Sequence, residues 1–138
     1  MIAWQYRLAG AFFIWVLGAC AQPQIAVKRV VGLEYPRLAA LAAVQGKVEL
    51  VALISPDGSV SGVRVASGHY LLRGPAEETL SQWVFAGCES SKSSCEARVV
   101  FDFVLEGACD KSWCGTRFVA DLPSFAEIRS RVPPAIVD

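Results

Sequence analysis

The sequence predicts a single α+β domain in which a small three-stranded antiparallel sheet packs against two helices. Three observations lead to this fold class: three segments whose apolar residues alternate with period two, a Pro-Asp-Gly turn between the first two of them, and two segments of helical spacing that begin at prolines. The chain of 138 residues is long enough for one domain. With 54% hydrophobic residues, 19% charged residues and a formal net charge of zero, its composition is not that of a disordered tail or a nucleic-acid-binding arm.

The first half of the predicted domain is a helix followed by a β-hairpin. Pro36 opens the helix, and Gly46 ends it. Residues 47–55 alternate with apolar side chains on both faces, which is typical of a central strand. The Pro-Asp-Gly turn then leads back into residues 59–67, which we predict to be the second strand.

The second half begins with a helix whose first turn contains Pro75 and which runs to about Trp83. Its buried stripe is expected to consist of Ala76, Leu80, Trp83 and Val84. Residues 98–105 form the predicted third strand. The apolar side chains on one face of this strand are Val99, Phe101, Phe103 and Leu105.

The tail carries two weaker signals. Residues 116–122 alternate through Phe118 and Ala120, which makes them a candidate fourth strand that would pair with the third. Ser124 and Glu127 have the spacing of a capping box, which predicts one short C-terminal helix that the two consecutive prolines at 133–134 end.

The N-terminal segment resembles a bacterial lipoprotein signal. Arg7 is its one charged side chain, residues 8–17 are apolar, and Leu-Gly-Ala stands directly before Cys20. The apolar core is short for a membrane-spanning helix, so we expect cleavage before Cys20 and acylation of this cysteine. The resemblance implies an outer-membrane lipoprotein facing the periplasm, because no aspartate follows the cysteine. The alternative is an uncleaved anchor that leaves a periplasmic domain on the inner membrane.

The predicted organisation has four parts: a signal at 1–19, a tether at 20–34, the domain at 35–106 and a disulfide-stapled extension at 107–138. Apart from Cys20 the chain has an even number of cysteines, which suits an oxidising compartment. They are Cys88, Cys95, Cys109 and Cys114. Three pairings are open; proximity in sequence favours 88 with 95 and 109 with 114. A zinc site is the competing interpretation, but the spacings are looser than those of zinc ribbons.

Residues 35 to about 105 resemble the C-terminal domain of the TonB family of periplasmic energy transducers. The resemblance rests on an ordered set of short motifs rather than on any single one. In sequence order they are Tyr35-Pro36, Gly46-Lys47-Val48, Asp57-Gly58, Ser67-Gly68, Leu71-Leu72 and Trp83-Val84-Phe85.

This resemblance implies a binding module and not an enzyme. Domains of the family capture a short extended segment of an outer-membrane transporter, which adds as a strand beside the third strand of their sheet. By position, the receiving edge here would consist of Arg98, Val99, Val100, Phe101, Asp102, Phe103 and Val104. Tyr35 and Pro36 match the motif that lies near the partner in the family.

The chain departs from the family's energy transducers in three respects. Its N-terminal segment is short and contains no histidine, and no long Pro-rich spacer follows it. The tail after Leu105 could also pair with the third strand and cover the docking edge. The alternative function is therefore a structural lipoprotein, a scaffold in an envelope assembly with a closed sheet edge and no role in transport.

The sequence contains no recognisable catalytic, metal or phosphate-binding constellation, so we expect no cofactor, no metal, no small-molecule substrate and no nucleic-acid partner. His69 is the only histidine and is expected to be a loop residue. Asp57 is expected to serve the turn rather than a calcium loop, because the further spaced oxygens of such a loop are missing. Trp83 and Phe85 are expected to close the core.

Overall fold

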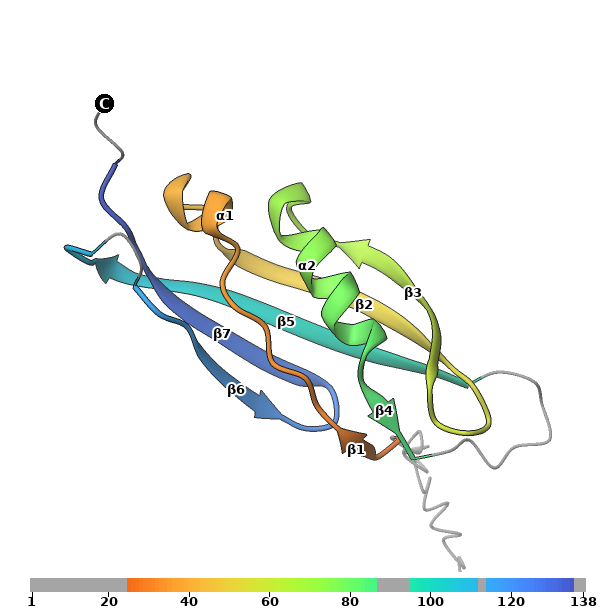
Figure 1. The fold of residues 1–138 in the computed structure, drawn as a ribbon. Helices are drawn as coiled ribbons and strands as arrows, with labels where there is room; N and C mark the ends of the chain where they lie inside the picture. The colour runs from red at the N-terminus through yellow and green to blue at the C-terminus, as the bar shows by residue number, and fades with distance from the viewer. Residues whose placement is uncertain (1–24, 87–94, 112–113, 136–138) are drawn as a thin grey trace, which may run out of the picture.

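The computed structural model describes residues 25–86, 95–111 and 114–135. In this part of the chain, a five-stranded mixed sheet carries both helices on one face (Figure 1). The helices are α1 (Arg37–Leu41) and α2 (Tyr70–Ser81). The strands in spatial order are β3 (Val60–Ser67), β2 (Gly46–Ile54), β5 (Cys95–Ala108), β7 (Phe125–Val132) and β6 (Arg117–Asp121). A separate short pair joins β1 (Val27–Arg29) to β4 (Val84–Phe85).

The predicted hairpin is present as β2 and β3, which pair antiparallel. Gly58 adopts a φ of 92° at the turn, a conformation that favours glycine. The Asp57 carboxylate accepts hydrogen bonds from the Ser59 N–H at 3.0 Å and the Ser59 hydroxyl at 2.7 Å. These bonds hold the pKa of Asp57 below its usual value. Asp57 thus stabilises the turn, as its sequence context predicts.

Helix α1 is shorter than predicted. Ala43 takes a left-handed φ of 53°, and the Val44 N–H donates to the Ala39 carbonyl, which closes the helix before Gly46 is reached. Gly46 instead begins β2. The helix still buries its inner side, because Ala39 and Ala40 pack into the core.

Helix α2 begins five residues before the predicted proline, and Pro75 lies inside it. His69 is the reason for the early start, because its Nδ1 accepts a hydrogen bond from the Leu71 N–H and so caps the first turn. We predicted a loop position for this histidine, and in the structure it is the residue that caps the N-terminus of α2. The helix ends at Ser81, so Trp83 follows it instead of belonging to its last turn.

The most consequential difference from prediction concerns β5. It pairs antiparallel with β2 on one side and parallel with β7 on the other. The sheet is therefore five-stranded and mixed, and the prediction of a three-stranded antiparallel sheet was wrong. The candidate fourth strand exists as β6, but it pairs with β7 and lies outside it (Figure 1).

The predicted C-terminal helix was also wrong, since residues 125–132 form β7. The capping-box spacing competes with a period-two pattern in the same residues. Ala126 and Ile128 face the core and are fully buried, whereas Glu127 and Arg129 lie on the opposite face. The strand is favoured because the edge of β5 supplies backbone partners that an isolated short helix would lack.

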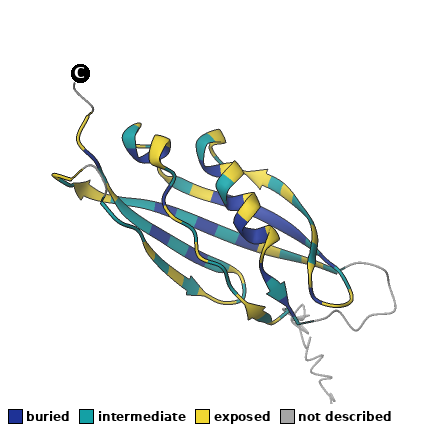
Figure 2. Ribbon diagram, viewed as in Figure 1, coloured by how far each residue is buried: buried dark blue, intermediate teal, exposed yellow. Residues whose placement is uncertain are grey.

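The core lies between the helices and the inner faces of β2, β5 and β7 (Figure 2). Trp83 and Phe85 belong to it, as predicted, with 1% and 0% of their surface exposed. The rings of Trp83 and Phe101 meet edge-on, with their centroids 5.6 Å apart. The Nε1–H of Trp83 donates to the Val31 carbonyl at 2.9 Å. The polar end of this large buried side chain is thus satisfied.

Residues 25–34, which the sequence assigns to the tether, pack against the domain. β1 pairs with β4, and Ile25, Val27 and Leu33 contact the core. The stretch that follows β1 crosses the helical face of the sheet (Figure 1). Gly32 lies against the ring of Phe118, close enough that an added Cβ would sit 3.4 Å from it. The segment therefore covers part of the helical face on the β7–β6 side of the sheet, next to α1, which contacts β7.

Replacing Ile128 by alanine is expected to lower the free energy of unfolding by about 2–5 kcal/mol, because a fully buried side chain is truncated. Urea unfolding of the two proteins measures the difference. Val119→Ala on β6, where the side chain is 46% exposed, is the matched control and should cost less than about 1 kcal/mol. Equal, small losses in both variants would show that β7 is not part of the core.

Candidate functional site: the edges of the sheet

The residues predicted to receive a partner strand all lie on β5, and they alternate between two environments. Val99, Phe101 and Phe103 are buried against the helices. Those on the opposite face are partly or largely exposed, namely Arg98, Val100, Asp102 and Val104. β5 is thus a central strand with one covered face and one face that carries no helix in the described part of the chain.

Both edges of β5 are occupied along most of this stretch. On one side, residues 46–54 of β2 pair with residues 95–103. On the other side, Val100–Leu105 pair in parallel with Phe125–Ser130, and the Val100 N–H donates to the Ser124 carbonyl at 2.8 Å. While β7 is in place, the backbone of these residues therefore offers no vacant edge to a further strand.

Three kinds of contact hold β7 in this position. Ala126 and Ile128 are buried in the core. Arg129 donates from its guanidinium to the carboxylates of Glu127 on its own strand and Glu106 on β5. The bond from Arg129 lowers the pKa of Glu127, and both carboxylates raise that of Arg129, so Glu127 and Arg129 stay ionised at neutral pH. Buried apolar contacts, ladder bonds and an ion pair between strands thus all favour the paired state.

Tyr35 is brought beside the predicted edge residues, but it faces the interior. Only 2% of its surface is exposed, and its ring meets that of Phe103 edge-on, with the two ring centroids 5.5 Å apart. Its hydroxyl donates to the Val44 carbonyl at 2.6 Å, and its backbone N–H donates to the Thr116 hydroxyl at 2.9 Å. Pro36 follows as the N-cap of α1 and is half-buried. Through its bond to Thr116, Tyr35 therefore connects the start of the domain to the C-terminal extension.

Burial raises the pKa of Tyr35 to about 12, and the charge of Asp102 adds to the shift. The neutral phenol is the form that the fold stabilises. Its contribution to stability is therefore complete below pH 10, the ordinary pKa, and is lost as the pH rises toward 12.

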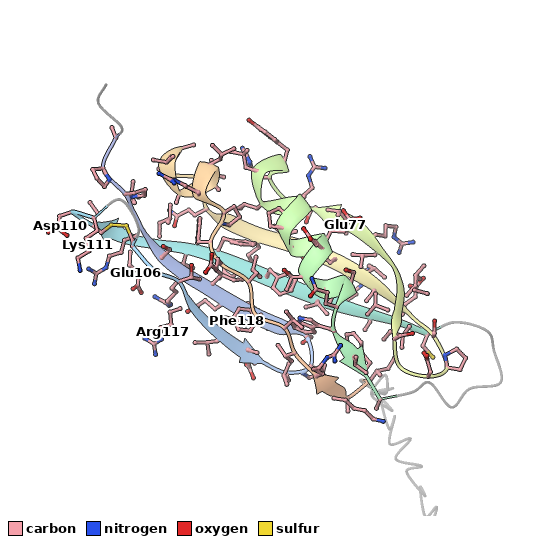
Figure 3. The ribbon with its side chains drawn as sticks, in the orientation of Figure 1. Glu77, Glu106, Asp110, Lys111, Arg117 and Phe118 are labelled. Atoms are coloured by element: carbon pink, nitrogen blue, oxygen red, sulfur yellow. A yellow bond between two sulfur atoms is a disulfide. The ribbon has the colours of Figure 1, made fainter. Side chains whose placement is uncertain are left out.

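The expected disulfide between Cys109 and Cys114 is present, with the two Cα atoms 6.1 Å apart. It closes the connection that leads from β5 to β6 (Figure 3). Cys95 is disulfide-bonded, whereas its expected partner Cys88 lies outside the described residues. Cys20 and the predicted signal also lie outside them.

The described residues contain no group of three or more potential metal ligands among their histidine, cysteine and acidic side chains. No helix in the same ranges is both long and apolar enough to cross a membrane. His69, which as the only histidine of the sequence could suggest acid–base chemistry, caps α2 through its Nδ1. Its ring stacks on that of Tyr70, with the two ring centroids 4.6 Å apart.

The strand that occupies the β5 edge, β7, is the part of the candidate site that the sequence did not predict. The alternation of Ala126, Ile128 and Ser130 is the signal that could have revealed it, since all three pair on the inner face with β5. The two remaining edges of the sheet are those of β3 and β6, which end the strand order.

A model of the family described as "Gram-negative bacterial TonB protein C-terminal" matches residues 31–105. The match covers more than half of the sequence and includes β2, β3, α2 and most of β5. The chain belongs to the TonB C-terminal family. Searches of curated proteins and of solved structures found no significant match to it.

Membership places the TonB-type domain in a non-enzymatic family of protein-interaction domains that act in the periplasm and contact outer-membrane transporters or other envelope proteins. The match ends at Leu105, within β5. The strand that covers the β5 edge and the strand beyond it therefore both follow the matched region.

Tyr35→Phe is expected to remove a late component, near pH 12, from the tyrosine titration, which is followed by the ultraviolet absorbance of tyrosinate. The unchanged protein should show this component near pH 12, because burial raises the pKa of Tyr35. Tyr70, which is 70% exposed, supplies the control: Tyr70→Phe should leave the late component in place. Loss of the late component in the Tyr70 variant instead would contradict the assignment.

Proposed function

We propose that this chain is an envelope scaffold protein: a TonB-type domain whose strand-capturing edge is filled by its own C-terminal extension. The observation that carries the proposal is the parallel pairing of Val100–Leu105 with Phe125–Ser130. A captured peptide would add as a strand at this same edge. The chain supplies that strand itself, and the site for a transporter segment is thereby closed.

Exchange of β7 for a foreign strand would be unfavourable. The incoming segment would have to replace the ladder bonds of β7 and also the burial of Ala126 and Ile128. Full burial of one isoleucine side chain is worth about 1.5–3 kcal/mol. The ion pair of Arg129 with Glu106 would be lost as well. A short peptide would also lose freedom on binding, whereas β7 is already tethered to the domain.

The scaffold would be held at the membrane by a lipid on Cys20, as the N-terminal sequence predicts. The described domain begins a few residues after this position, and β1 already pairs with β4. Little free chain would then separate the lipid from the folded domain. This arrangement suits a protein that stays close to one membrane surface, facing the periplasm.

The second candidate is strand capture at the edge that the resemblance implies, with Arg98–Val104 as the receiving strand and Tyr35 and Pro36 beside it. One observation favours it: the family match ends at Leu105, so β6 and β7 are additions to a domain that is otherwise of the capturing type. In this case the β6–β7 hairpin would leave as a unit and the partner would take its place.

Titration of the isotope-labelled protein with transporter N-terminal peptides, followed by NMR, separates the two candidates. We expect no shifts of the amides of Val100–Val104 or Ile128. Their hydrogen exchange should be as slow as that of Leu50, because all of these amides lie in the same core sheet. Shifts at Val100–Val104 together with rapid exchange at Ile128 would overturn the scaffold proposal in favour of capture.

The anchor is tested separately by intact mass and by membrane fractionation of the full chain. The mature protein should begin at Cys20 and carry the mass of its acyl chains, and Cys20→Ala should abolish both the cleavage and the added mass. Cys109→Ala, which removes a cysteine of the folded domain, is the matched control and should leave the lipid in place. Unmodified Cys20 in the membrane fraction would overturn the lipoprotein assignment.

A further inference from the structure

The outer edge of β6 is an unpaired strand edge. β6 ends the strand order of the sheet, and β7 is its only strand partner among the described residues (Figure 1). None of the backbone hydrogen bonds of the described turns and loops involves residues 117–121. Backbone N–H and C=O groups therefore line this edge without a protein partner in the described part of the chain.

The two free edges of the sheet differ in how well they are protected against pairing. β3 carries two irregularities against β2, where Ser61 and Ala66 are extra residues, and such bulges discourage a further strand. β6 pairs with β7 over five consecutive residues without any shift of register. It contains no proline, and its two charged residues, Arg117 and Asp121, stand at its ends and leave the middle of the strand uncharged. β6 is therefore the edge that is ready to accept a strand.

The charged ends of β6 have no opposite charge across from them. Arg117 lies opposite Arg129, a like charge, and Asp121 lies opposite Phe125. Among the described residues, the ion pairs are those of Arg129, and neither Arg117 nor Asp121 takes part in them. Arg117 acts on Glu127 of β7 only through its charge, which helps to lower the pKa of that carboxyl. In Figure 3 Arg117 points away from the rim of the sheet, whereas Phe118 points inward.

Apolar surface is exposed at the same place. Val119 and Leu122 are each 46% exposed, and they are two of the four large apolar side chains that the described residues expose. Val119 lies midway between Arg117 and Asp121, and all three side chains share one face of the strand.

We propose that β6 is a self-association edge, through which two copies of this chain pair antiparallel about a two-fold axis at Val119. The sequence Arg-Phe-Val-Ala-Asp complements itself in this arrangement. Arg117 of each copy lies opposite Asp121 of the other, Phe118 lies opposite Ala120, and Val119 lies opposite itself. The two sheets then continue into one another.

The charges specify this arrangement against the alternatives. Parallel pairing in register would place Arg117 beside Arg117 and Asp121 beside Asp121, and like charges in direct opposition are destabilising. An antiparallel register shifted by two residues would leave Arg117 opposite Val119 and would lose both ion pairs. Only the symmetric antiparallel register pairs all four charges and also buries Val119, as a two-fold interface requires.

The interface is small, because the paired strand has five residues. An interface of this size is expected to be reversible rather than permanent. Sedimentation velocity of the full chain in mild detergent should therefore show a monomer that converts to a dimer as the protein concentration rises. If the chain stays monomeric up to a concentration of about 1 mM, the dimer is too weak to be a specific contact, and the proposal is overturned.

Charge substitutions test the register directly. Arg117→Glu makes both ends of β6 acidic, and Asp121→Arg makes both ends basic. For each variant alone, the dissociation constant of the dimer should rise by at least about tenfold, since two attractive pairs become repulsive. An equimolar mixture should dimerise again, because the acidic edge of one variant complements the basic edge of the other. Failure of the mixture to recover the dimer would contradict the proposed pairing.

Val119→Lys adds a second test, because it places two ammonium groups face to face on the two-fold axis. The side chain is exposed in the monomer, so the fold should be kept, which circular dichroism checks. Ser61→Lys on the exposed edge of β3 adds the same charge and is the matched control. The Val119 variant should lose the dimer and the Ser61 variant should keep it; the reverse result would assign the association to β3.

Discussion

The pairing of β5 on both of its edges is the constraint on which the rest of this structure depends. Because β2 and β7 flank it, the inner face of β5 lies at the centre of the core, where Phe101 and Phe103 meet Trp83 and Tyr35 edge-on. These two aromatic contacts fix the segment after α2 and the segment before α1. The positions of both helices on the sheet thus follow from the depth at which β5 is buried.

The same constraint separates the family's fold from the family's mode of binding. The matched region retains the hairpin, the second helix and the central strand of a TonB C-terminal domain. What differs is the state of one edge, which is decided by residues after the matched region. In the proposed function, the domain keeps the architecture of its family while its own chain fills the edge at which a partner strand would add, and other surfaces determine its partners.

Much of the fold could be predicted from local patterns, because those patterns coincide with the tertiary structure. The Asp57–Gly58 turn and the alternation along 47–55 and 59–67 specify a hairpin with short-range information alone. The order of strands around β5 could not be predicted in the same way, since a parallel pair between residues about 25 positions apart leaves no turn signal.

Two errors had a more specific physical origin. The Ser124–Glu127 spacing favours a helix as a local pattern, whereas the strand edge that residues 125–132 meet is a non-local partner. The start of α2 was placed at Pro75 because a histidine cap is less common than a proline in the first turn, although His69 performs the capping here. The candidate site residues lie on β5, and the occupation of its edge by β7 depends on contacts that no local pattern encodes.

The position of β7 between β5 and β6 has a consequence for how the chain assembles. A sheet of this topology cannot be built strand by strand in sequence order, because the strand that follows β5 in the chain is not the one that neighbours it. The β6–β7 hairpin is a local structure with short loop closure, whereas the β5–β7 pairing is non-local. The hairpin is thus expected to form first and to dock as a unit, and until it docks β5 presents an uncovered edge to neighbouring chains in the crowded envelope.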